Sequence, residues 1–198
     1  MNNWLLKKTV VKFISIMICL ICLITLNTVA AASSSSSALH PPFYYKDQMV
    51  FKVSSYSSSP WSFSRYIDSG GERMFLFDPK QVAFAIYDEY GRRIGVGKAV
   101  GGGTWCSDVG RSCRTVRGEF KVYSKGSKYC KSGAYPRPHG GAPMPYCMHF
   151  HRGYAIHGSY DLPDKNASHG CIRVDKQTAK WLSENFIQKG TKVVVLDY

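Results

Sequence analysis

The feature that most constrains the fold is a series of short apolar runs, separated by turn residues, that begins at Met74. The runs are Met74 to Phe77, Val82 to Tyr87, Ile94 to Val100, Glu119 to Tyr123, Tyr154 to Ile156 and Lys192 to Leu196. Runs of this length between turn residues are typical of β-strands. Gly91 can adopt the positive φ that a hairpin turn requires. The pattern therefore predicts a mostly β domain over residues 74–198.

One short helix is expected near the C-terminus. Three apolar residues recur there at helical spacing: Ala179, Leu182 and Phe186. Asp175 can cap the first turn of a helix over Lys176 to Gln188, and Gly190 can end it. A chain of 198 residues is long enough for one core, so a single folded domain with an N-terminal extension is expected.

The N-terminus has the pattern of an export signal. Lysines precede an apolar run from Phe13 to Leu26, and small residues follow up to Ala32. The run is shorter than the roughly 20 residues that span a bilayer. We expect residues 1–32 to be a cleaved signal peptide, which would place the protein in the periplasm or cell envelope. Retention as a membrane anchor and a buried core helix are the alternatives.

Residues 33–73 form a segment rich in Ser, Tyr and Pro. This composition is typical of a tether between the signal and the domain. Aromatic residues such as Tyr44 and Trp61 would instead allow the segment to lie over the domain.

The chain is strongly basic, with 26 Lys and Arg against 13 Asp and Glu and a formal net charge of +13. Removal of residues 1–32 takes away lysines and no acids, so the excess remains. Basic residues concentrate between Arg111 and Lys131, with Glu119 as the one acid among them. A solvated face and attraction to an anionic envelope polymer both explain this run. Nucleic acid is not expected as a partner, because no nucleic-acid-binding motif is present, and membrane contact is expected only if the signal is uncleaved.

Seven cysteines are present, two of them within residues 1–32. The remaining five are Cys106, Cys113, Cys130, Cys147 and Cys171. Thiols of an exported protein tend to pair, and an odd number leaves one over. The hypothesis is that near neighbours pair, Cys106 with Cys113 and Cys130 with Cys147, which leaves Cys171 as a free, reactive thiol.

Two histidines lie close in sequence to Cys171, which belongs to the run Ser168-His169-Gly170-Cys171-Ile172-Arg173. A thiol has a pKa of about 8.5 and needs a base, usually imidazole, to react near neutral pH. If the run is extended, His169 and Cys171 share a face, and Gly170 leaves room for substrate. His157 ends a predicted strand and could approach from a neighbouring strand equally well. The alternative is that Cys171 is a buried structural thiol.

Neither a metal site nor a nucleotide site is expected, so no cofactor is predicted. Cys147, His149 and His151 alternate, and His139 and His157 are near, which could suggest zinc. However, paired C-x-x-C ligands are absent and Cys147 has a plausible disulfide partner. The glycines at 101–103 are followed by neither a P-loop lysine nor a dinucleotide fingerprint, so they predict a turn.

The pattern His157-Gly158 followed by Ser168-His169-Gly170-Cys171 and Arg173 resembles the active-site signature of L,D-transpeptidase catalytic domains. The strands around residues 82–103 are similar to the family's opening hairpin, residues 115–120 to its threonine-proline-x-glycine-x-phenylalanine segment, and Met144-Pro145-Tyr146 to its methionine-proline-tyrosine loop. Val116 stands where proline is usual. The four cysteines other than Cys171 are extra to the family pattern.

The resemblance implies a β-sandwich or barrel with one short helix near the C-terminus. It further implies that Cys171 is the nucleophile, that His157 is the general acid and base, and that the Gly158 carbonyl orients His157. His169 would be a neighbour of the site rather than the base.

The resemblance also implies roles for the residues around these. Ser168 would support the loop, Arg173 would hold the site or a substrate carboxylate, and Met144 and Tyr146 would line the substrate groove. The backbone amides of His169, Gly170 and Cys171 would form an oxyanion hole.

The implied reaction is acyl transfer on peptidoglycan stem peptides. Cys171 would attack the carbonyl between the L-centre of diaminopimelate and the terminal D-alanine and form a thioester. Transfer to a stem-peptide amine gives a cross-link, transfer to a protein lysine anchors a protein, and transfer to water gives an L,D-carboxypeptidase. A non-catalytic, basic cell-wall-binding module is the non-enzyme alternative.

Overall fold

The computed structural model describes residues 43–45, 48–51 and 61–198. The predicted signal peptide, residues 1–32, lies outside the described residues, as does much of the segment 33–73. Within that segment, β1 (Phe43–Tyr45) and β2 (Gln48–Phe51) pair antiparallel. Among the described residues, no helix has the length and apolar character needed to cross a membrane.

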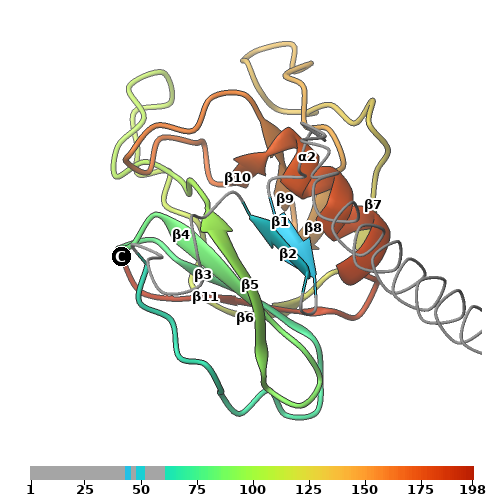
Figure 1. The fold of residues 1–198 in the computed structure, drawn as a ribbon. Coiled ribbons are helices and arrows are strands. Elements are labelled where there is room, and N and C mark those ends of the chain that lie inside the picture. The colour runs from blue at the N-terminus through green and yellow to red at the C-terminus, as the bar shows by residue number, and fades with distance from the viewer. Residues whose placement is uncertain (1–42, 46–47, 52–60) are drawn as a thin grey trace, which may run out of the picture. The chain divides into compact units, whose positions relative to one another are not determined.

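The larger sheet has five strands in the order β5-β4-β3-β11-β6 (Figure 1). Their bounds are β3 Met74–Asp78, β4 Ala83–Tyr87, β5 Arg93–Lys98, β6 Gly118–Lys121 and β11 Lys192–Val195. β11 lies parallel to β3, and the other neighbours are antiparallel. The last strand of the chain is therefore buried in the middle of the sheet, as its continuous apolar run Lys192 to Leu196 suggests.

The second sheet has four strands in the order β10-β9-β8-β7. Their bounds are β7 Ser124–Lys125, β8 Met148–His151, β9 Tyr154–Ser159 and β10 Ile172–Asp175. β10 is parallel to β9, and a long connection of residues 160–171 joins them. This connection brings the run around Cys171 back to the strand that carries His157.

The helix follows β10 directly. α2 (Lys176–Trp181) continues as one turn of π-helix, η1 (Leu182–Phe186). The Asp175 carboxylate accepts hydrogen bonds from the amides of Gln177 and Thr178, which is the N-cap expected from the sequence. Ile187 is extended, so the helix ends two residues before the predicted Gln188.

The main core lies between the inner faces of the two sheets. Phe75 and Phe77 of β3 point to it, beside their partners Val193 and Val195 of β11. The second sheet contributes Met148, Phe150, Ile156, Ile172 and Val174, and the helix contributes Ala179, Leu182 and Phe186. Backbone hydrogen bonds between Val100 and Arg173 tie the larger sheet to β10. β10, which follows the run around Cys171, is therefore joined by hydrogen bonds to both sheets.

The outer face of the larger sheet is also covered. Met74, Ala85 and Tyr87 are buried there against Phe63 and Ile67. Because both faces of β4 are packed, every residue of this strand is buried.

The prediction of a mostly β fold with one short C-terminal helix is confirmed. The apolar runs correspond to β3, β4, β5, β6, β9 and β11. Five described strands were not among those runs: β1, β2, β7, β8 and β10. β7 has only two residues, and β8 and β10 alternate apolar and polar side chains, so neither forms an unbroken apolar run.

Candidate active site

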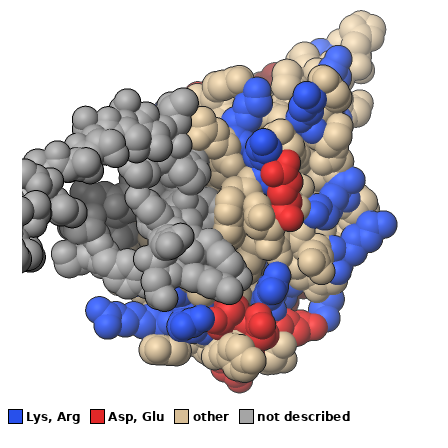
Figure 2. Space-filling view, turned by 45° about the vertical axis from the view of Figure 1, so that its right-hand side comes forward, with Lys and Arg blue, Asp and Glu red and all other residues tan. Residues whose placement is uncertain are grey.

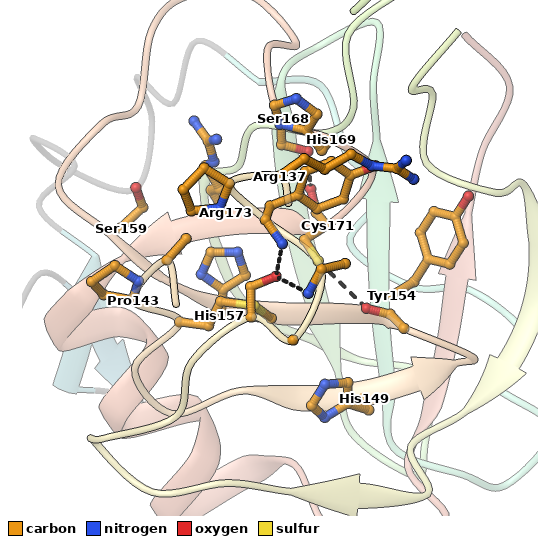
Figure 3. Close-up of a pocket in the computed structure, with 18 of the residues that line it drawn as sticks. Arg137, Pro143, His149, Tyr154, His157, Ser159, Ser168, His169, Cys171 and Arg173 are labelled. Carbon is orange, nitrogen blue, oxygen red and sulfur yellow. Dashed lines mark hydrogen bonds between the residues drawn. The ribbon is translucent and has the colours of Figure 1, made fainter. Parts of the chain in front are cut away.

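His157 and Cys171 are brought to one face by the pairing of β9 with β10. Arg173 is the register partner of His157 in this parallel pair. Side chains at paired positions of parallel strands point to the same face, so Arg173 shares the face of His157, and Cys171 directly precedes β10. All three side chains line a cavity of about 700 Å³ (Figure 3). The structure therefore gathers the predicted nucleophile and base in one cavity.

His157 is almost fully buried, with 6% of its surface exposed. Its Nδ1 lies 2.9 Å from the carbonyl oxygen of Gly158, and because a carbonyl only accepts, Nδ1 carries the proton and donates. Burial lowers the pKa of His157 to about 4, against the opposing effect of this hydrogen bond. The ring is therefore neutral at neutral pH, and Nε2 is free to accept a proton.

Cys171 is the free cysteine among the described residues. Its Sγ lies 3.8 Å from the Gly153 carbonyl oxygen, to which the thiol donates. Burial raises the pKa of the Cys171 thiol, while the Ala155 backbone and the charge of Arg173 act in the opposite direction. Together with the lowered pKa of His157, this makes the resting pair a neutral thiol and a neutral imidazole.

Ser168 closes the turn that precedes Cys171. Its hydroxyl donates to the Cys171 carbonyl at 2.5 Å and accepts from the Gly170 amide at 3.0 Å. Gly170 has φ +123°, and a Cβ there would lie 2.6 Å from the Tyr154 ring. Only glycine fits this turn without strain. The Gly170 amide is occupied by Ser168, so the amides of His169 and Cys171 are the better candidates for an oxyanion hole.

His169 does not face Cys171 in the way that an extended run would place it. The positive φ of Gly170 breaks the alternation between them. Nε2 of His169 instead lies 2.8 Å from the Asp108 carboxylate, and its ring stacks on Tyr135 with 4.3 Å between ring centroids. The local expectation of a shared extended face is therefore wrong, because tertiary contacts hold the His169 ring elsewhere.

Arg173 reaches from β10 into the same cavity. Its Nη1 lies 2.9 Å from Oδ2 of Asp161, in the connection between β9 and β10. This ion pair ties the connection to the strand that it precedes.

The Met144-Pro145-Tyr146 loop supports the end of β9. The Gly158 amide donates to the Pro145 carbonyl at 2.8 Å, so the loop fixes the residue whose carbonyl orients His157. A Cβ on Gly158 would come within 3.2 Å of Pro145 and of Ala179 in α2, which explains the need for glycine. Met144 lines the cavity, whereas Tyr146 packs against the main core.

Both expected disulfides are present in the structure, Cys106–Cys113 and Cys130–Cys147. They close two loops, residues 106–113 and 130–147, that border the cavity. Cys147 is therefore not available as a zinc ligand alongside His149 and His151. A second group of possible ligand atoms, on Cys106, Asp108 and His169, is used within the protein by a disulfide and a hydrogen bond.

Several residues of the cavity were not found from the sequence. They are Arg111, Tyr135, Arg137, Pro143, His149, Ser159 and Asp161. Burial lowers the pKa of His149, which lies on β8 beside Ala155 of β9. No motif marks these residues, since most lie on loops whose path depends on the disulfides. One signal in the sequence could have indicated part of this set. The expected Cys130–Cys147 disulfide closes a loop that contains the Met144-Pro145-Tyr146 motif, so other residues of the loop could be expected near the site.

The basic run from Arg111 to Lys131 does not form one continuous charged patch. Arg117 pairs with Asp197 and Lys121 with Glu72. On the face shown in Figure 2, Lys and Arg side chains are spread across the described surface, while acidic ones gather mainly at the lower edge. Binding to an anionic envelope polymer stays a prediction.

Comparison with known proteins gives consistent matches. The family model YkuD, described as the L,D-transpeptidase catalytic domain, matches residues 65–195. No curated protein matches the chain in a sequence search.

Among solved structures, an L,D-transpeptidase from Xylanimonas cellulosilytica is 26% identical, with a TM-score of 0.56 over 68% of this chain and 65% of that one. An L,D-transpeptidase from Mycobacterium tuberculosis is 20% identical, with a TM-score of 0.53 over 64% of this chain and 58% of that one. L,D-transpeptidase 3 from the same organism, in complex with a faropenem-derived adduct, is 21% identical, with a TM-score of 0.53 over 64% and 60%.

The chain thus spans 58% to 65% of the length of these three structures. The two matches below 25% identity support the fold alone. The family model, in contrast, covers well over half of the 198 residues and includes both His157 and Cys171. On this match, and with the fold and cavity described above, the protein belongs to the L,D-transpeptidase catalytic domain family.

Proposed function

We propose that this protein is an L,D-transpeptidase that acts on peptidoglycan stem peptides outside the cytoplasm. The observation that carries the proposal is the free thiol of Cys171 in the same cavity as the buried, oriented imidazole of His157. Membership of the family and the two disulfides support it, since disulfides are typical of exported proteins.

In the first step, the Cys171 sulfur attacks the carbonyl carbon of the bond between the L-centre of diaminopimelate and the terminal D-alanine. Nε2 of His157 takes the thiol proton as the S–C bond forms. The carbonyl oxygen becomes an oxyanion that the amides of His169 and Cys171 can stabilise, and such a donor contributes about 3 kcal/mol. His157 then gives its proton to the departing amine, and a thioester remains.

In the second step, an amine of another stem peptide attacks the thioester. His157 accepts a proton from that amine and returns it to the leaving sulfur, which restores the neutral thiol and imidazole. Attack by water in place of the amine would make the same site an L,D-carboxypeptidase.

The direct test is turnover of purified disaccharide-tetrapeptides, followed by mass spectrometry of the products. Wild-type protein should give cross-linked dimers and free D-alanine, and Cys171→Ala should give neither. Products shortened by D-alanine without dimers would indicate the carboxypeptidase. If Cys171→Ala is as active as wild type, the proposal fails.

A second test uses faropenem, because the related Mycobacterium tuberculosis L,D-transpeptidase 3 has been seen with a faropenem-derived adduct. We expect an adduct on the intact protein, and peptide mapping should place it on Cys171. If wild-type protein neither turns over the tetrapeptides nor forms the adduct, a non-catalytic cell-wall-binding module is favoured.

A further inference from the structure

The cavity contains more positive charge than its own acids neutralise. Three arginines line it: Arg111, Arg137 and Arg173. Arg173 is paired with Asp161. Over residues 61–198, neither Arg111 nor Arg137 takes part in an ion pair. Two guanidinium groups of the cavity are therefore left without a carboxylate partner.

These two arginines come from the two disulfide-closed loops. Arg111 lies in residues 106–113, closed by Cys106–Cys113, and Arg137 lies in residues 130–147, closed by Cys130–Cys147. Each disulfide shortens the free chain that carries its arginine and so limits the positions that the arginine can reach. The cysteines that do this are the ones that depart from the family pattern.

A stack of side chains joins the two loops through the catalytic motif. The Asp108 carboxylate, from the first loop, binds Nε2 of His169 at 2.8 Å. The His169 ring stacks on Tyr135 of the second loop. The Arg137 guanidinium carbon lies 5.9 Å from the centroid of the same Tyr135 ring, within the range of a cation–π contact. His169, two residues from Cys171, thus holds both loops in relation to the nucleophile.

Asp108 balances the charge of these arginines only in part. Its carboxylate is occupied by His169, and the His169 hydrogen bond, with a smaller contribution from the charge of Arg137, lowers the Asp108 pKa. Asp108 is not among the residues that line the cavity. The exposed guanidinium groups of Arg111 and Arg137 are therefore available to a ligand anion that enters the cavity.

We propose that Arg111 and Arg137 form a carboxylate-binding subsite, which selects stem peptides with a free carboxylate over amidated ones. This proposal rests on the proposed function and adds the substrate class. A guanidinium presents a planar set of N–H donors that matches a carboxylate, whereas a carboxamide has no charge and offers N–H groups that guanidinium cannot accept. The two residues joined by the scissile bond each carry one such carboxylate, on the D-centre of diaminopimelate and on the terminal D-alanine.

The test compares three disaccharide-tetrapeptides: one with both carboxylates free, one amidated at diaminopimelate and one amidated at the terminal D-alanine. For wild-type protein, kcat/KM should fall about tenfold or more for one amidated substrate, and tenfold corresponds to about 1.4 kcal/mol. The double variant Arg111→Gln/Arg137→Gln should lose a similar factor on the free substrate. On the substrate whose amidation removes the bound carboxylate, kcat/KM of the double variant should equal that of wild-type protein.

The control is Arg114→Gln/Lys131→Gln, which removes the same charge from the same two regions. Neither residue lines the cavity. This variant should retain the wild-type preference. If the control variant loses the preference for the free carboxylate as Arg111→Gln/Arg137→Gln does, the preference results from general electrostatic attraction, and the proposal of a defined subsite is wrong. If Arg111→Gln/Arg137→Gln slows all three substrates equally, the subsite does not exist. Thermal unfolding of each variant checks that the fold is intact.

Binding separates this proposal from the proposed function. Cys171→Ala protein, with and without the two arginine substitutions, is titrated calorimetrically with the three tetrapeptides. Arginine-dependent binding of the free carboxylate without any turnover by wild type would keep the subsite and overturn the transpeptidase. Turnover without a carboxylate preference would keep the transpeptidase and overturn the subsite.

Discussion

The carbonyl oxygen of Gly158 accepts a 2.9 Å hydrogen bond from Nδ1 of the adjacent residue, His157. This contact fixes the tautomer of the imidazole, so that Nε2 is the nitrogen available as a base. Gly158 is itself held by the Pro145 carbonyl. The orientation of His157 therefore depends on the Met144-Pro145-Tyr146 loop, which holds Gly158 in place.

Replacement of the two histidines should have unequal effects. His157→Ala should lower kcat/KM by about 100- to 10,000-fold, the usual contribution of a general acid–base group. His169→Ala should lower it by a smaller factor, because Nε2 of His169 is held by Asp108 and takes no part in proton transfer. Steady-state turnover of disaccharide-tetrapeptides measures both. A larger loss for His169→Ala would contradict the assignment of the base.

The free energy of unfolding should decrease as the pH is lowered, because of His157. Above pH 6.5 the ring is neutral in both folded and unfolded protein, whereas between 6.5 and about 4 only the unfolded chain gains the proton. The free energy of unfolding should then drop by up to about 3 kcal/mol over this range. Urea unfolding of wild type and His157→Gln at several pH values isolates the effect. A constant difference between the two proteins from pH 7 to pH 4 would exclude it.

Gly170→Ala should damage both stability and activity. Alanine at φ +123° costs about 1 to 2 kcal/mol in backbone strain, and its Cβ would also displace the Tyr154 ring. Gly190→Ala is the control, because Gly190 has φ +93° with nothing within 4 Å of a Cβ. Melting temperatures should fall for both variants, and more for Gly170→Ala. Only Gly170→Ala should also slow the formation of the faropenem adduct on Cys171.

The two disulfides should stabilise the protein to similar extents. Loop-closure entropy predicts a loss of about 3 kcal/mol for Cys130→Ala/Cys147→Ala, with a sequence separation of 17, and about 2.5 kcal/mol for Cys106→Ala/Cys113→Ala, with a separation of 7. Denaturant unfolding measures both. No change in stability on removal of either bridge would show that the loops are held by their other contacts alone.

Local patterns predicted the elements that depend on local physics. The Asp175 cap and the spacing of Ala179, Leu182 and Phe186 predicted the helix, because capping and amphipathicity act within a few residues. Continuous apolar runs predicted the strands of the larger sheet. β8 and β10 were missed as strands because their alternating side chains place one face in the core and leave the other polar, so neither forms an unbroken apolar run.

The site was predictable only in part. The residue types and their order in the motif indicated a reactive thiol with an imidazole near it, and they resembled the L,D-transpeptidase family. The sequence left His169 and His157 open as bases on local grounds. The parallel pairing of β9 with β10 places His157 in the cavity with Cys171, and Asp108 and Tyr135 hold the His169 ring.

The sequence by itself determined the strand-rich class, the capped helix and the presence of a cysteine in a recognisable motif, since each follows from residue identity and short-range spacing. Only the tertiary structure decided that His169 is held by Asp108 while His157 is oriented by the Gly158 carbonyl, how burial acts on His157 and Cys171, and which arginines line the same cavity. Those outcomes depend on strand register, on desolvation and on loops closed by disulfides. Such effects join residues that are far apart in the chain, and no local pattern records them.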